Sequence, residues 1–294
     1  MIGNQYFKIF ISIFLFWFLT LIPEKITIVI SYFFVMTLGI IHGSNDLQII
    51  RRLESTIKLK LISITIYLCV IFTSIILLFF FEKLAYLLFI IFSSYHFGEQ
   101  HFNAKKFTQK TNKYVLYLFH GIVIFSLIFL NKISEVVKIS KELFSITLTE
   151  NFLLLFSIIS TSIYFLLLLF NYYINNDYKT IFEEILYCCF FYVLFKATSL
   201  IVGFSIYFII WHSVPSILDQ IKFLYAGSSR SLLALYLKKS FLLWFGSILF
   251  IGSFYLFLGS DYLLESFIFG ILFIISIPHI LVISIMNYVY KKLY

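Results

Sequence analysis

The chain alternates between long apolar runs and short polar connections. A helix needs about 20 apolar residues to cross a hydrocarbon layer about 30 Å thick, because each residue advances it by about 1.5 Å. This pattern predicts about ten membrane-spanning helices, at residues 6–22, 26–41, 59–81, 84–97, 113–130, 151–174, 181–195, 198–213, 240–258 and 262–288. The longest connections, 131–150 and 214–239, mix polar and apolar residues, which is compatible with short interfacial helices. We therefore expect an all-α, polytopic transmembrane bundle that forms one domain over residues 1–294.

Composition strengthens this interpretation. Hydrophobic residues make up 62% of the chain and charged residues only 12%, whereas an ordinary soluble domain has about 45–50% apolar and about 25% charged residues. The sequence thus excludes a water-soluble fold.

The positive charge indicates topology rather than a nucleic-acid partner. The net charge is +8, but the basic residues lie in short loops and form neither a patch nor a stripe. Lys and Arg accumulate on the cytoplasmic side of membrane proteins. With ten spans and a cytoplasmic N-terminus, most of the 22 basic residues fall inside, and those left outside are Lys25, Lys83, Lys132, Lys138, Lys141 and Lys196. Both termini are predicted to be cytoplasmic, in the inner (plasma) membrane.

The six histidines all fall in the cytoplasmic half of this topology. His42, His96 and His212 lie at the inner ends of three different predicted helices, and the others are His101, His120 and His279. An imidazole at membrane depth needs a polar partner. Metal ligation supplies one, because neutral imidazole binds Fe, Zn, Cu or Ni. The alternatives are an interhelical hydrogen bond, favoured for His120, and a solvated loop position for His101.

The residues around the first histidines suggest supporting groups. Asp46 follows His42 by one helical turn and is a candidate to orient its imidazole, although Gly43 favours a helix end between them. His96 and His101 are about 140° apart around a helix, so they reach one metal only if the helix breaks near Gly98. Glu99 and Gln100 are candidate hydrogen-bond partners of the ligands, with an interfacial loop position as the alternative for Glu99.

Two prolines mark the later histidines. Val214 precedes Pro215 and is biased away from helical geometry, which predicts that His212 caps its span, with Asp219 as a candidate partner or an ordinary loop residue. Pro278 cannot donate a backbone hydrogen bond, so a kink is expected at His279.

Four motifs in order along the chain resemble the Brp/Blh family of membrane β-carotene 15,15'-dioxygenases. They are HGSND, SSYHFGEQH, IYFIIWHS and IPHILV, and they span nearly the whole chain. The resemblance implies cleavage of β-carotene by O₂ into two retinals at an Fe²⁺ held by histidines, with His42, His96 and His212 as ligands. Many members carry a further histidine where this chain has Ser216. The fourth ligand is then His279 or His101, or the iron is held by three histidines and water.

The same resemblance implies a bilayer-dissolved substrate and an apolar route to the metal. Tyr95, Phe97 and Trp211 adjoin the expected ligands and are candidate contacts for the polyene, with ordinary core packing as the simpler explanation. An opsin is the implied recipient of retinal.

Two other functions compete with this one. Membrane di-iron desaturases use eight or more histidines in HxxxH and HxxHH boxes, by resemblance to that family, and this chain has six histidines and no such box. A non-catalytic carotenoid- or retinal-binding protein or transporter is the second alternative, and Ser216 is the feature that favours it.

Overall fold

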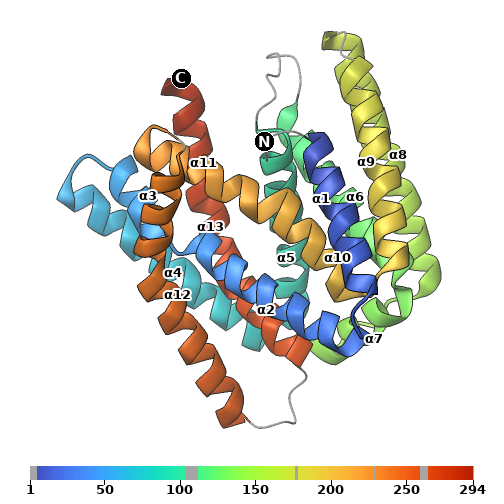
Figure 1. The fold of residues 1–294 in the computed structure, drawn as a ribbon, viewed down its shortest axis with the longest axis horizontal. Helices are drawn as coiled ribbons and strands as arrows, with labels where there is room; N and C mark the ends of the chain where they lie inside the picture. The colour runs from blue at the N-terminus through green and yellow to red at the C-terminus, as the bar shows by residue number, and fades with distance from the viewer. Residues whose placement is uncertain (1–4, 104–111, 176–177, 228, 259–263, 294) are drawn as a thin grey trace. The chain divides into compact units, whose positions relative to one another are not determined.

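The fold is all-α, as the hydrophobic pattern predicts. A computed structural model describes residues 5–103, 112–175, 178–227, 229–258 and 264–293, and no strand occurs among them. Its elements (Figure 1) are α1 Gln5–Thr20, α2 Glu24–Gly43, α3 Asp46–Leu53, α4 Ile57–Phe80, α5 Glu82–His101, α6 Lys113–Asn131, α7 Ile133–Phe144, α8 Glu150–Asn175, α9 Tyr178–Ala197, α10 Leu200–Ile206, the π-helix η1 Tyr207–Ser213, α11 Val214–Tyr225, α12 Arg230–Leu258 and α13 Leu264–Leu293.

Each predicted apolar segment coincides with a helix. The main differences lie in the connections: α7 occupies the first long one, and α11 and the start of α12 occupy the second. The short helix α3 follows α2 after a two-residue turn. Tyr262, the predicted start of the last segment, lies outside the described residues.

The chain is organised as two compact units, each built from separate stretches of sequence. The first comprises Met1–Lys8, Tyr32–Ala85 and Phe208–Tyr294, and the second comprises Ile9–Ser31 and Tyr86–Tyr207. The chain passes between them within α1, α2 and α5 and after the first residue of η1. The single domain expected from the sequence stays a prediction.

In the first unit, α13 packs against α3 and α4, and α11 packs against α3 and α12. The core at these crossings is apolar, with Ile49 and Ile50 from α3, Ile221 from α11, Tyr236 from α12 and Ile283 from α13. Its helices therefore converge on the short α3, which begins at Asp46.

In the second unit, α6 is the central helix. It contacts α7, α8, α9 and α10, and most of its residues from Leu116 to Ile128 are buried. The helices α8 and α9 run side by side (Figure 1). Ser157 of α8 donates a hydrogen bond to the Ser126 carbonyl of α6 at 3.1 Å, so a polar contact also joins α6 and α8.

Seven helical runs in the described part of the chain are long and apolar enough to cross a membrane: Glu24–Leu53, Ile57–Phe80, Lys113–Asn131, Glu150–Asn171, Leu200–Tyr225, Arg230–Phe250 and Ile268–Tyr290. Large apolar side chains on them face outward, as Leu242 does at 78% exposure. A surface of this kind suits lipid and would aggregate in water. The chain is thus a membrane protein, while the count of ten spans, the cytoplasmic termini and the inner membrane stay predictions.

Two glycines let the backbones of α5 and α6 touch. A Cβ atom added at Gly98 would lie 1.9 Å from the Tyr117 carbonyl oxygen, and one at Gly121 would lie 2.0 Å from the Ser94 carbonyl oxygen. These distances are far shorter than any contact that a real side chain makes. The crossing therefore depends on glycine at both positions.

We expect Gly121→Ala to destabilise the fold by about 1–3 kcal/mol or more, because the two backbones must separate to admit a methyl group. The melting temperature in detergent measures this loss. Gly246→Ala in α12 is the matched control, since no atom lies within 4 Å of its added Cβ and alanine favours a helix by up to about 1 kcal/mol. Equal melting temperatures for Gly121→Ala and the native protein would show that the close crossing is absent.

Candidate metal centre

Three buried histidines meet in the first unit. His42 is the second-last residue of α2, His212 lies in η1, and His279 lies in α13. The Nε2 atoms of His42 and His279 are 2.7 Å apart. The ring centroid of His42 lies 4.2 Å from that of His279 and 4.9 Å from that of His212. Three helices distant in sequence thus deliver imidazoles to one place.

His212 does not cap its helix, contrary to the expectation from Val214–Pro215. The helix continues from η1 into α11, and Pro215 is the second residue of α11. In an α-helix the proline ring would clash with the carbonyl four residues earlier, and the wider π turn just before it relieves that contact. His212 therefore sits in an irregular turn, a feature that often marks functional sites.

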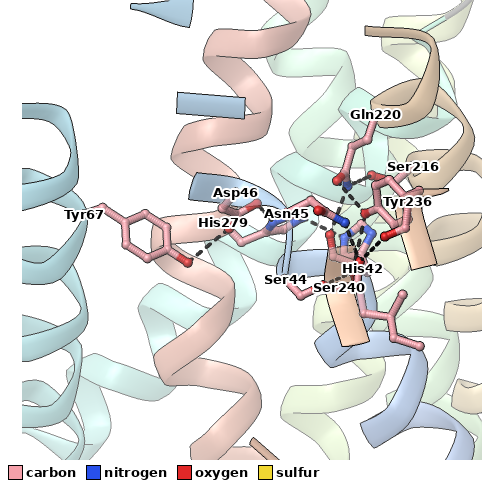
Figure 2. Close-up of polar contacts among 11 residues, drawn as sticks. His42, Ser44, Asn45, Asp46, Tyr67, Ser216, Gln220, Tyr236, Ser240 and His279 are labelled. Carbon is pink, nitrogen blue, oxygen red and sulfur yellow. Dashed lines mark hydrogen bonds and ion pairs between the residues drawn. The ribbon is translucent and has the colours of Figure 1, made fainter. Parts of the chain in front are cut away.

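Asp46 supports His279. Its Oδ1 lies 2.8 Å from His279 Nδ1, and Tyr67 donates its hydroxyl to Oδ2 at 3.1 Å (Figure 2). A carboxylate accepts from the protonated Nδ1, so the lone pair of the neutral ring lies on Nε2, the atom that faces His42. This contact fixes both the tautomer and the direction of the His279 ring.

From the sequence, Asp46 was a candidate to orient His42 if the helix continued past Gly43. The helix α2 ends at Gly43, as that residue suggested, and Asp46 opens α3. Because the chain turns between them, Asp46 is no longer one helical turn from His42, and its carboxylate contacts His279.

Buried amide and hydroxyl groups hold the end of α2. Gln220 Nε2 donates to the His42 carbonyl at 3.0 Å, and Tyr236 donates to Gln220 Oε1 at 2.8 Å (Figure 2). Asn45 Nδ2 donates to Ser240 Oγ. None of these residues was among the candidates predicted from the sequence. The available signal was that the last carbonyls of a buried helix need donors.

The donor set fits a divalent transition metal. Neutral imidazoles are ligands for such ions, and histidines that bind metals commonly donate their other ring N–H to a carboxylate, as His279 does to Asp46. His42, His212 and His279 are each less than 5% exposed, so their rings are shielded from bulk solvent.

A second buried polar cluster lies within the second unit. His101 Nε2 is 2.9 Å from Glu184 Oε1, Tyr164 donates to Glu184 Oε2 at 2.9 Å, and His120 Nδ1 is 3.0 Å from the Tyr164 hydroxyl. The rings of His101 and His120 stack with centroids 4.0 Å apart. The interhelical hydrogen bond expected for His120 is therefore present. Glu184 was missed, because a carboxylate in an apolar run gives no sign of its partners.

His101 is not a loop residue. The helix α5 continues through Gly98 to His101, because Gly98 packs against α6 and does not break the helix. His96 and His101 therefore face directions about 140° apart. Within the first unit, His279 lies beside His42.

The comparisons with known proteins decide the family. The model of the family described as beta-carotene 15,15'-dioxygenase matches residues 33–287. The chain belongs to this family. No curated protein and no solved structure matches it. All six histidines lie within the matched residues.

Membership of the beta-carotene 15,15'-dioxygenase family implies a carotenoid dioxygenase that acts on carotene and O₂. The resemblance seen in the four sequence motifs is thereby confirmed.

Several other residues that the sequence singled out lie in α5. His96, Glu99 and Gln100 are buried in the part of α5 that belongs to the second unit. Phe97 stacks on Phe125 at 5.7 Å, and Tyr95 contacts the Tyr117 ring.

Two expected residues lie in the first unit. Trp211 is buried, and the Lys8 ammonium nitrogen lies 5.4 Å from the centroid of its ring. Asp219, expected beside His212, forms a partly exposed ion pair with Lys222 at 3.1 Å.

Proposed function

We propose that this protein cleaves β-carotene with O₂ at the central 15,15' double bond and releases two retinals, in a reaction that depends on Fe²⁺. The observation that carries the proposal is the group of three buried imidazoles, His42, His212 and His279, with a carboxylate behind one of them. The family match supplies the class of reaction.

In this proposal His42, His212 and His279 hold the iron. The motif around His96 is the ground for proposing it as a further ligand. It belongs to the second unit, whereas the other three belong to the first. His279 takes the place of the histidine that many family members carry at the position of Ser216. Ser216 itself is buried and lies 3.4 Å from Gln220 Nε2.

The iron supplies O₂ activation when bound, and the chain supplies its position. Asp46 keeps the proton on Nδ1 of His279, so that Nε2 stays available as a ligand. Gln220 fixes the main chain at His42. Burial keeps bulk water from the reacting polyene.

The substrate is a hydrocarbon dissolved in the bilayer, which suits a protein with outward-facing apolar helices. We propose that Tyr95, Phe97 and Trp211 contact the polyene chain, because aromatic faces pack well on conjugated carbon. The opsin as recipient of retinal stays a prediction from the resemblance.

Expression in bacteria that make β-carotene tests this function. We expect the orange colour to bleach and retinal to become extractable, and we expect His212→Ala to remain orange at equal expression. Chromatography of cell extracts measures both compounds. Persistent colour with carotenoid bound to the purified native protein would instead favour a non-catalytic binding protein, the alternative suggested by Ser216.

A further inference from the structure

We propose that His101, His120 and Glu184 form a second binding site for a divalent transition-metal ion, built from residues other than those of the iron centre. One ligand atom from each of the three lies within 4.8 Å of the others. All three belong to the second unit, so the site needs no residue from the first.

The donor set suits such an ion. Two imidazoles and one carboxylate form a known ligand combination for iron(II) and for zinc, which leaves further positions open. Each carboxylate oxygen of Glu184 faces one imidazole nitrogen: Oε1 is 2.9 Å from His101 Nε2, and Oε2 is 3.6 Å from His120 Nδ1. The Tyr164 hydroxyl contacts both Glu184 and His120 and adds a third oxygen.

Charge supports the same assignment. The Glu184 side chain is 1% exposed, and its helix is largely apolar. A buried carboxylate is costly unless it is hydrogen-bonded and paired with positive charge. A divalent ion held by both imidazoles would lie beside this carboxylate and balance its charge.

The scaffold holds the ligands firmly. His101 lies one turn after Gly98 and His120 lies directly before Gly121, the two glycines where the backbones of α5 and α6 touch. Glu184 comes from α9, which contacts α6. Ligands on packed helices keep their geometry better than ligands on loops.

Cobalt titration of the full-length protein tests the proposal. The protein is purified in detergent, stripped with a chelator and titrated anaerobically with Co²⁺, and the bound metal per chain is measured after gel filtration. We expect two equivalents for the native protein, one for Glu184→Gln and one for His42→Ala. Glu183→Gln is the matched control, because Glu183 precedes Glu184 and its ion pair with Lys179 lies at the surface. It should retain two equivalents.

The outcomes separate this site from the iron centre. A native protein that binds one equivalent, unchanged in Glu184→Gln, would overturn the second site and leave a purely hydrogen-bonded cluster. If Glu184→Gln does not fold, His42→Ala decides alone: one remaining equivalent supports the site and none overturns it. One equivalent that disappears in Glu184→Gln and persists in His42→Ala would support this site and overturn the proposed iron centre.

Discussion

His279→Ala is expected to lose iron and to reduce retinal formation by at least about 100-fold, more than the loss of a residue that only supports a ligand. The ring that disappears faces His42 with one nitrogen and Asp46 with the other. Its removal also leaves the Asp46 carboxylate without this buried partner. Iron per chain after anaerobic reconstitution and retinal formed per minute are the two measurements.

Met286→Leu is the matched control for that variant. Met286 lies two turns further along α13 and is buried in the apolar core of the same unit, and exchange of Met for Leu conserves volume. We expect native iron content and activity. Full iron content and full activity in His279→Ala would remove His279 from the ligand set. It would then be open again which residue replaces the family histidine that is absent at Ser216.

Asp46→Asn is expected to weaken iron binding by about 10–100-fold while the protein stays folded. The amide has the shape of the carboxylate but lacks its charge, so it holds the Nδ1 proton of His279 less firmly. Because Asp46 acts through His279, activity should recover when iron is raised, with the maximal rate close to native. Competition with a chelator of known affinity measures the change.

A purely structural role for Asp46 would give a different result, namely a lower melting temperature of the metal-free protein and no recovery with added iron. Glu54→Gln is the control for the change of charge. Glu54 directly follows α3 and accepts a hydrogen bond from Ser63 at 2.9 Å. We expect it to bind iron like the native protein.

Much of the fold could be predicted from the sequence because the bilayer imposes a simple rule on apolar length. That rule places the helices that carry His96, His120, His212 and His279, but it ends the helix of His101 before that residue. It does not predict α3, whose eight residues include two arginines and whose burial comes from its neighbours. The number of spans is also not fixed by length alone, since α1 has only 16 residues and α9 carries Glu183 and Glu184.

The candidate site was predicted in part. His42, His212 and His279 were candidates because imidazole at membrane depth needs a polar partner, and the structure brings their rings together. Their role as metal ligands stays a prediction. The contacts of Asp46 with His279 and of His101 with Glu184 could not be predicted, because they join residues far apart in the chain. A helix break near Gly98 was the condition for His96 and His101 to share a metal. Gly98 instead admits the backbone of α6, which depends on a helix that local sequence does not reveal.

The π-helical turn before α11 makes this stretch sensitive to the number of residues that it contains. Such a turn accommodates an extra residue, so a single deletion within Tyr207–Ser213 would let the α-helical hydrogen bonds close. The flanking turns would keep their phase, because the wider turn already absorbs the extra residue, and only the residues within it would change direction. Point substitutions in this stretch change one side chain at a time, but loss of one codon would change the direction of several side chains together, that of His212 among them.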